Sequence, residues 1–487
     1  MARRSTRWTA LAATFALAAG VGFAAVSSNG SASAAGVAPM ADIVPKGGKV
    51  TSKGNPLCPV IPPTSTPTPT PGVTPAPQPV VHQKNCILPY LKGWRPKLGP
   101  VFNNPLGSKA AAQANIRRVV NAINHAPKRS YIRIAVYSFD RSEVAYALRK
   151  AKKRGVRIQV VVNGAVMSGV TRGLQKYLGS NPKKSSFVIS CSGACRSKGP
   201  GGNLHDKVFA FSRTGGARGL LIIGSGNLTS KATYRQWNDS NAISQDTALY
   251  GAWIQMFTQI KNRKRVGPRR ISYAATSGAY GAQFSKIMGV SRSTTKVVAI
   301  KKTGRYKASS DRVVKRLKRV TCAAPKGYGS NGRTLIRITM YAMFKARGEA
   351  IAREIARLKR NGCNIMMIMS VPGGKTARIL SKAGIPLRSA DWLFTERDPL
   401  VEDGIGGYGP RFYSHYKVMA LSGMYNGKPT DTVWTGSENW DALSFANEEV
   451  VIQLNNRDTF QKYYGQFKYM WNSRVTHRMG IQPLYGP

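Results

Sequence analysis

The chain is short of acidic residues. Its 487 residues include 20 Asp and Glu against 74 Lys and Arg, a formal net charge of +54 at neutral pH. Such an excess favours polyanionic partners, whether nucleic acid, anionic lipid or a cell-wall polymer. The charge indicates little about the fold. A generally basic surface on an extracellular protein, with no specific polyanionic partner, is the alternative interpretation.

Long apolar runs are also scarce. Only residues 9–26 approach the roughly 18 apolar residues that a membrane span needs, so no second span is expected. Three arginines precede this run, and the small residues Ala32-Ser33-Ala34 follow it, which is the order of a secretory signal peptide. We predict that residues 1–34 are a signal peptide and that the protein is secreted and extracellular. An uncleaved N-terminal anchor is the alternative.

Cysteines number only six, and an exported protein can pair them. Cys191 and Cys195 are close enough in sequence for a small loop disulfide. The other four leave several pairings open: Cys58, Cys86, Cys322 and Cys363. No second close cysteine pair or local histidine pair accompanies the first one, so we expect no zinc site. We also expect no other metal and no cofactor.

Composition divides the chain into a tether and a globular part. The run at 62–79 alternates Pro with Thr and small residues, so it cannot build a core and should be extended. We therefore predict a Pro/Thr-rich linker over 35–95, a first lobe over 96–270 and a second lobe over 271–487.

The globular part contains a duplication. Ile132-Arg133-Ile134, followed by Tyr137, indicates a buried strand, and Ile336-Arg337-Ile338 with Tyr341 repeats it 204 positions later. A helix with apolar residues at i, i+4 and i+7 follows in each copy. Each helix is expected to end at a glycine, and an apolar strand follows it. The helices, glycines and strands are expected at 144–151 and 351–358, at Gly155 and Gly362, and at 156–162 and 363–369.

The duplication extends to two polar motifs. His205-Asp206-Lys207 recurs as His415-Tyr416-Lys417, displaced by 210 positions. Gly224-Ser225-Gly226-Asn227 recurs as Gly436-Ser437-Glu438-Asn439, displaced by 212. A slowly growing offset is typical of loop insertions in a duplicated domain. The sequence therefore predicts an α/β fold of two related lobes with mixed sheets.

These residue types suit phosphate chemistry. Each His-x-Lys begins a strand-like run, so its His and Lys project from one face. A Gly-Ser-x-Asn turn would bring an amide and a hydroxyl beside each imidazole. Two such lobes would assemble a metal-free receptor for a tetrahedral anion, with the imidazoles dividing the nucleophile and acid roles. The other three histidines have no matched partner and are expected to be structural or surface residues: His82, His125 and His477.

The doubled motif pair resembles the phospholipase D superfamily over about residues 96–480. The resemblance implies two α/β/α/β/α lobes with the active site at their interface. It implies that His205 attacks phosphorus to form a phosphohistidine and that His415 protonates the leaving alcohol. The residues implied to hold the phosphoryl oxygens are Lys207, Lys417, Asn227 and Asn439, helped by Ser225 and Ser437.

The sequence departs from the family pattern in two respects. Ser212 and Ser422 replace the Asp that usually follows the motif lysine by five residues. In the second half, Glu449 is the best candidate for the carboxylate that orients the opposing His. In the first half, Ser240 takes the corresponding position, and Asp239, one residue off, would face the other side of a strand. We predict that one His lacks an orienting carboxylate and that the two imidazoles differ in pKa.

The substrate class stays open between two polyanions. We predict an enzyme, a monomeric phospholipase D-type hydrolase that releases phosphatidate and free headgroup from glycerophospholipids at a membrane surface. Basic clusters at 149–154, 261–270 and 301–319 suit an anionic interface, yet they suit nucleic acid equally well. A secreted, metal-independent nuclease is therefore the second hypothesis. An inactive polyanion-binding protein of the same fold is the third.

Overall fold

The structure is a computed structural model that describes residues 89–196, 202–264, 272–277, 280–286, 308–395 and 409–479. All of these lie in one compact unit of the chain, Val44–Pro487. The predicted signal peptide and most of the predicted linker lie outside the described residues, as do His82, Cys58 and Cys86. So do 265–270 and 301–307 of the predicted basic clusters. Within the described part, no helix is both long and apolar enough to cross a bilayer.

The first lobe is built on a seven-stranded mixed sheet with the order β1-β8-β6-β5-β2-β3-β4. Strands β2, β3 and β4, at one side of this sheet, run parallel, and the remaining neighbours pair antiparallel. Its strands are β1 (Gly99–Phe102), β2 (Tyr131–Val136), β3 (Arg157–Asn163), β4 (Phe187–Cys191), β5 (Lys207–Thr214), β6 (Ala217–Gly224) and β8 (Asp239–Ile243). Its helices are α1 (Lys109–Ala112), α2 (Ala114–Asn124), α3 (Ser142–Lys153), α4 (Gly169–Leu178), α5 (Ser230–Tyr234) and α6 (Thr247–Lys261), with a 3-10 turn η1 (Gly164–Val166).

The second lobe repeats this strand order. Its ten-stranded sheet runs β20-β14-β13-β12-β17-β18-β19-β10-β9, with β11 paired to β17. Its strands are β9 (Ser272–Ser277), β10 (Tyr280–Lys286), β11 (Val320–Thr321), β12 (Leu335–Met343), β13 (Asn364–Pro372), β14 (Leu387–Ser389), β17 (Lys417–Tyr425), β18 (Lys428–Gly436), β19 (Glu448–Leu454) and β20 (His477–Arg478). Its helices are α8 (Arg312–Lys318), α9 (Lys345–Arg360), α10 (Gly374–Lys382) and α11 (Arg457–Asn472), with 3-10 turns η3 (Ala308–Ser310) and η4 (Leu443–Phe445). The shared order β8-β6-β5-β2-β3-β4 and β19-β18-β17-β12-β13-β14 confirms the predicted duplication.

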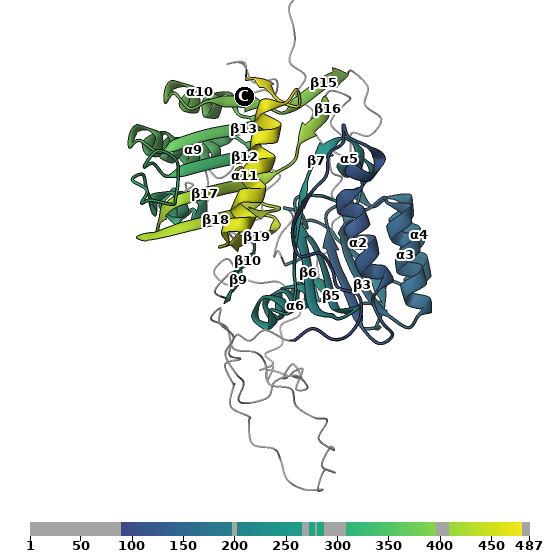
Figure 1. Cartoon of the computed structure of the whole chain (residues 1–487). Helices are drawn as coiled ribbons and strands as arrows, with labels where there is room; N and C mark the ends of the chain where they lie inside the picture. The colour runs from purple at the N-terminus through teal and green to yellow at the C-terminus, as the bar shows by residue number, and fades with distance from the viewer. Residues whose placement is uncertain are drawn as a thin grey trace, which may run out of the picture. The chain divides into compact units, whose positions relative to one another are not determined.

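Helices cover the sheets as the apolar spacing predicted. Val144, Leu148 and Ala151 of α3 are buried, and the backbone turns left-handed at Gly155, just after the helix (φ 86°). Figure 1 shows α2, α3 and α4 lined up on one face of the first sheet. One cluster of buried apolar residues includes side chains from both sheets and from α6 and α11. The two lobes therefore share one hydrophobic core.

Backbone pairing and disulfides complete the framework. A small sheet joins the lobes, with β15 (Asp391–Thr395), β16 (Gly409–Ser414) and β7 (Gln236–Trp237), of which only β7 belongs to the first lobe. Cys191 and Cys195 form the predicted loop disulfide. Cys322 pairs with Cys363 across 41 positions, which resolves one of the open pairings. By the loop-entropy model, this longer crosslink contributes roughly 4 kcal/mol to stability.

Candidate active site

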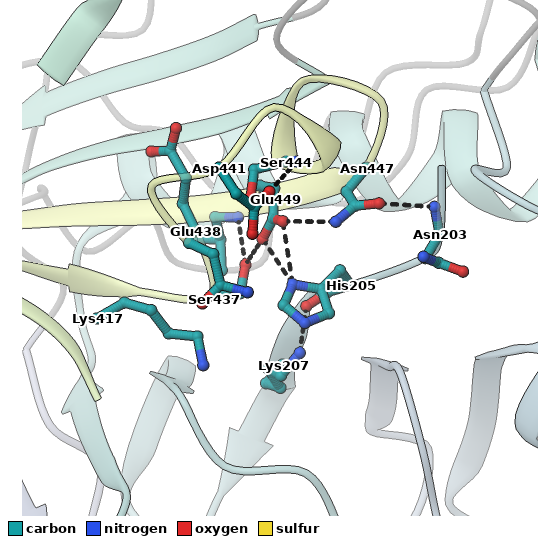
Figure 2. A network of polar contacts seen from close by, with 12 residues as sticks. Asn203, His205, Lys207, Lys417, Ser437, Glu438, Asp441, Ser444, Asn447 and Glu449 are labelled. Carbon is teal, nitrogen blue, oxygen red and sulfur yellow. Dashed lines mark hydrogen bonds and ion pairs between the residues drawn. The ribbon is translucent and has the colours of Figure 1, made fainter. Parts of the chain in front are cut away.

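The two His-x-Lys motifs stand at matching places in the two lobes. Lys207 and Lys417 are the first residues of β5 and β17, and each histidine lies two residues before its lysine. Each ammonium group donates to the backbone carbonyl of its own histidine, at 2.6 Å for Lys207 and 2.8 Å for Lys417. Figure 2 shows both lysine side chains directed towards the space beside His205. The structure thus brings the predicted His and Lys residues together.

Each motif is held by the opposite lobe through its backbone. The His205 N–H donates to the carbonyl of Glu448 at 3.1 Å, and the His415 N–H donates to the carbonyl of Trp237 at 3.0 Å. Glu448 directly precedes Glu449, whose side chain contacts the His205 imidazole. Trp237 directly precedes Asn238, whose side chain contacts the His415 imidazole. The relation is therefore a pseudo-twofold, and the site needs both lobes.

Glu449 lies where the sequence placed an orienting carboxylate. Both of its oxygens are 3.0 Å from Nδ1 of His205, which belongs to the other lobe. The same carboxylate accepts from the Ser437 hydroxyl at 2.5 Å and from the Asn447 amide at 3.0 Å (Figure 2). With Nδ1 directed at the carboxylate, Nε2 of His205 is left to face a substrate.

The partner of His415 differs from the sequence-based expectation. Asn238, and not Ser240 or Asp239, faces this imidazole, with Oδ1 at 3.0 Å from Nδ1. The Ser240 hydroxyl instead donates to Asn115, and Asp239 accepts from Thr435 and Tyr463. The sequence pattern matched Asn238 with Asn447, whereas the structure places Asn238 at the position of Glu449, two residues further along the second half. The prediction that one imidazole lacks a carboxylate nevertheless agrees with this geometry.

The two motif serines support these orienting side chains. The Ser225 hydroxyl donates to Asn238 Oδ1 at 3.0 Å and accepts from the Asp239 N–H at 3.1 Å. The Ser437 hydroxyl donates to Glu449 and accepts from the Val450 N–H at 2.9 Å. Both hydroxyls are fully buried and engaged. The geometry therefore favours a positioning role for the serines over the phosphoryl contact that the resemblance implied.

The two motif asparagines are equivalent in another way. The side-chain carbonyl oxygens of Asn227 and Asn439 are both buried, and neither has a hydrogen-bond partner among the described residues. A buried polar atom without a partner costs about 1–3 kcal/mol. An unpartnered oxygen at the same position of both lobes is typical of groups that complete their hydrogen bonds when a ligand is present.

Two tyrosines, Tyr137 and Tyr341, belong to the site, although their sequence pattern indicated only a pair of strands. The ring centres of Tyr137 and His205 are 5.5 Å apart, and the Lys207 ammonium lies 5.5 Å from the Tyr137 ring centre. In the second lobe, both corresponding separations around Tyr341 are 4.8 Å. The aromatic faces stabilise the lysine cations. Their recurrence 204 positions apart was the signal that could have identified them.

Burial and like charge change the protonation of the site. Burial, together with the two lysines, lowers the pKa of both His205 and His415 well below the ordinary histidine value. Burial and the proximity of Lys207 lower the pKa of Lys417. Burial raises the pKa of Glu449 to about 7. Neutral imidazoles at neutral pH retain the lone pair that a nucleophile needs.

The serines that replace the motif aspartates lie away from this chemistry. Ser212 accepts from the Tyr131 N–H at 2.8 Å, and Ser422 accepts from the Gly329 N–H at 2.9 Å. Five residues of strand separate each serine from its motif lysine, a distance of roughly 16 Å. Both serines therefore hold neighbouring backbone along β5 and β17, away from the motif ends of these strands.

The remaining described histidines agree with structural or surface roles. His125 stacks on Trp94 with ring centres 4.1 Å apart, and His477 lies on the short strand β20. Among the residues that the structure describes, no group of three or more His, Cys, Asp or Glu is arranged to hold a metal ion.

Comparison with solved structures finds low identities. A polyphosphate kinase from Porphyromonas gingivalis is 10% identical over 77% of this chain, with a TM-score of 0.45, and the match spans about half (51%) of that protein. The phosphatidylserine synthase of Haemophilus influenzae Rd KW20 is 11% identical over 79% of this chain and 89% of its own, with a TM-score of 0.47. Nuc from Salmonella typhimurium, a phospholipase D family member, is 20% identical over 35% of this chain and 97% of its own, with a TM-score of 0.26.

Comparison with protein families is more specific. No curated protein matches the sequence. One family model, described as "Cardiolipin synthase, PLD-like domain", matches twice, over residues 119–261 and 330–471. The two matches cover more than half of the chain, and each contains one His-x-Lys motif and one Gly-Ser-x-Asn motif. Together with the duplicated fold, they show that this chain belongs to the phospholipase D superfamily.

Proposed function

We propose that the chain is a phosphodiesterase that forms a phosphohistidine on His205 and uses His415 as its general acid. One observation carries this proposal. Two imidazoles, one from each lobe, are each held at Nδ1 by a side chain of the opposite lobe, beside the same two lysines. This arrangement leaves both Nε2 atoms for one phosphorus centre.

The reaction takes two displacements. In the first, Nε2 of neutral His205 attacks phosphorus and the bond to the leaving alcohol breaks. His415, which is neutral in the free chain and takes up a proton on Nε2 when the phosphodiester anion binds beside it, gives that proton to the leaving oxygen. In the second, His415 takes a proton from water or another alcohol, whose oxygen attacks phosphorus and expels His205. Lys207 and Lys417 retain N–H donors for the nonbridging oxygens, because an ammonium group has three.

We take a glycerophospholipid as the first substrate class. The matching family model is named after a lipid enzyme, and the net charge of +54 favours an anionic interface. The test incubates the purified full chain with vesicles of phosphatidylglycerol and phosphatidylcholine, with a chelator present. Phosphatidate and free headgroup are the expected products. Their absence, with the same sample active on DNA, would reject the lipid substrate.

A nuclease is the second candidate, and a basic end of the first lobe favours it. Residues 89–264 contain five acidic residues in all. The Arg129 N–H donates to Gly155 and the Arg157 N–H donates to Ser130, which brings Lys128, Arg129 and Arg157 to one turn. There the Arg157 and Arg133 guanidinium groups lie 5.0 and 4.2 Å from the Tyr131 ring centre. Basic and aromatic groups together suit nucleic acid. The corresponding assay measures the disappearance of supercoiled plasmid at low salt. His205→Asn should no longer cleave the plasmid.

A further inference from the structure

The two imidazoles are oriented by chemically different groups. Nδ1 of His205 faces the carboxylate of Glu449, whereas Nδ1 of His415 faces the amide oxygen of Asn238, both at 3.0 Å. The supporting serines are equivalent in the two lobes. The lobes therefore differ in whether the group that faces Nδ1 of the histidine can carry a negative charge.

The amide of Asn238 has one allowed orientation. Its Nδ2 donates to the carbonyl of Ala232 at 3.1 Å and to Gln236 Oε1 at 3.3 Å. A backbone carbonyl only accepts, so the NH2 group must face Ala232 and the oxygen must face His415. The Ser225 hydroxyl accepts from a backbone N–H and therefore directs its own proton to the same oxygen. His415 must then carry its proton on Nδ1, which leaves the lone pair on Nε2.

We propose that Asn238 is a positioning residue that makes His415 the proton-transferring imidazole, while Glu449 makes His205 the imidazole that carries the phosphoryl group. The inference rests on the proposed function and adds a reason for the division of roles. In this scheme Asn238 fixes the direction of the proton without adding negative charge.

Charge balance explains the division. A histidine bonded to phosphorus at Nε2 and protonated at Nδ1 is a cation, and the Glu449 carboxylate compensates that cation on His205. Asn238 offers no such charge to His415. The charged groups that act on His415 are Lys417 from β17 and Lys207 from β5. Its titratable neighbours are His205 and two tyrosines, Tyr341 and Tyr413, whose ring centres lie 4.8 and 6.3 Å from that of His415.

The nearby carboxylates are engaged elsewhere. Asp239 is bound by Thr435 and Tyr463, Asp441 accepts from Ser444, and Glu449 faces His205. A protonated His415 is therefore poorly stabilised and gives its proton readily to a leaving alkoxide. As a neutral group it can then take a proton from the incoming water or alcohol, so its proton count is restored after two steps.

The first test needs no turnover. The chain has five histidines, so 15N-imidazole NMR of the full chain, assigned with His415→Asn, resolves each one. We expect His415 to be the Nδ1–H tautomer and its pKa to lie below the ordinary histidine value. An Nε2–H tautomer, or titration at the ordinary histidine value, would overturn the proposal.

The second test converts the amide into a carboxylate. In Asn238→Asp, we expect the pKa of His415 to rise by about one to three pH units. The high-pH limb of kcat/KM should move up with it. Asn241→Asp adds the same charge three residues further on, in β8, at a side chain that contacts Tyr463, and it should move the limb far less. An unmoved His415 pKa in folded Asn238→Asp contradicts the inference.

The third test maps the covalent intermediate. Samples mixed with substrate and quenched in alkali should carry the phosphoryl group, still esterified to the rest of the substrate, on His205, and the same group on His415 would reverse the assignment. In Glu449→Gln, the phosphorylated form should accumulate at least about tenfold less, because its cation has lost the carboxylate. If the wild-type chain cleaves neither lipid nor DNA, the proposed function fails. The NMR result would then still report whether Asn238 sets the tautomer.

Discussion

The two lobes share a strand order but differ in the layer behind the motif asparagines. In the second lobe, Arg347 is fully buried and binds Asp311 at 2.9 Å and Glu438 at 2.5 Å, and it also donates to the backbone of Asn439. Glu438 is the third residue of its Gly-Ser-x-Asn motif, and the first lobe has Gly226 there. The duplication has therefore kept the groups that face the substrate and changed those that support them.

The largest expected effect tests whether the two lobes form one site. His205→Asn and His415→Asn should each reduce kcat by roughly 10⁴-fold or more, because either change removes a group that both displacements require. His125→Asn is the matched control and should retain activity, since that ring stacks on Trp94. Normal kcat in either motif variant would mean that the lobes do not share a centre.

A buried arginine of the second lobe, paired with two carboxylates, gives the next effect. Arg347→Met leaves Asp311 and Glu438 buried without their cation, so the free energy of unfolding should fall by about 3–5 kcal/mol in urea titrations. Arg353→Met removes an exposed pair with Glu349, at 3.7 Å on the same helix, and should cost less than about 0.5 kcal/mol. Equal losses in the two variants would remove this contrast.

The supporting serines compare the lobes directly. Ser437→Ala removes a hydrogen bond to a charged group, and Ser225→Ala removes one to a neutral amide. Such bonds are worth about 1.5–3 and 0.5–1.5 kcal/mol. We expect kcat to fall about 10- to 100-fold for Ser437→Ala and about 2- to 10-fold for Ser225→Ala. The reverse order in steady-state kinetics would contradict the assignment of Glu449 as the charged partner.

The smallest effect concerns the missing aspartates. Ser212→Asp restores the usual motif residue, which would accept the same N–H of Tyr131. Because the site is roughly 16 Å away along the strand, kcat should change by less than about twofold. A larger change would show that this position acts on the chemistry.

The sequence predicted the parts that depend on local pattern. Strand and helix periodicity, the glycine at Gly155 and the paired motifs all follow from neighbouring residues, and all appear in the structure. The position that faces His415 was assigned wrongly because the sequence matched Asn238 with another asparagine, Asn447, two residues before its structural equivalent Glu449. The buried pair of Arg196 and Glu448, 252 positions apart, depends on tertiary contact that no spacing reports.

The backbone bonds that cross between the lobes have an evolutionary consequence. Each histidine N–H is bound by the other lobe, so a single lobe of this design would complete its site only in a symmetric dimer. In such a dimer every substitution appears twice, and the two imidazoles must have identical partners. Joining two copies in one chain removes that constraint. A carboxylate at position 449 and an amide at position 238 can then coexist, and a symmetric ancestor can become an enzyme with a distinct donor and acceptor side.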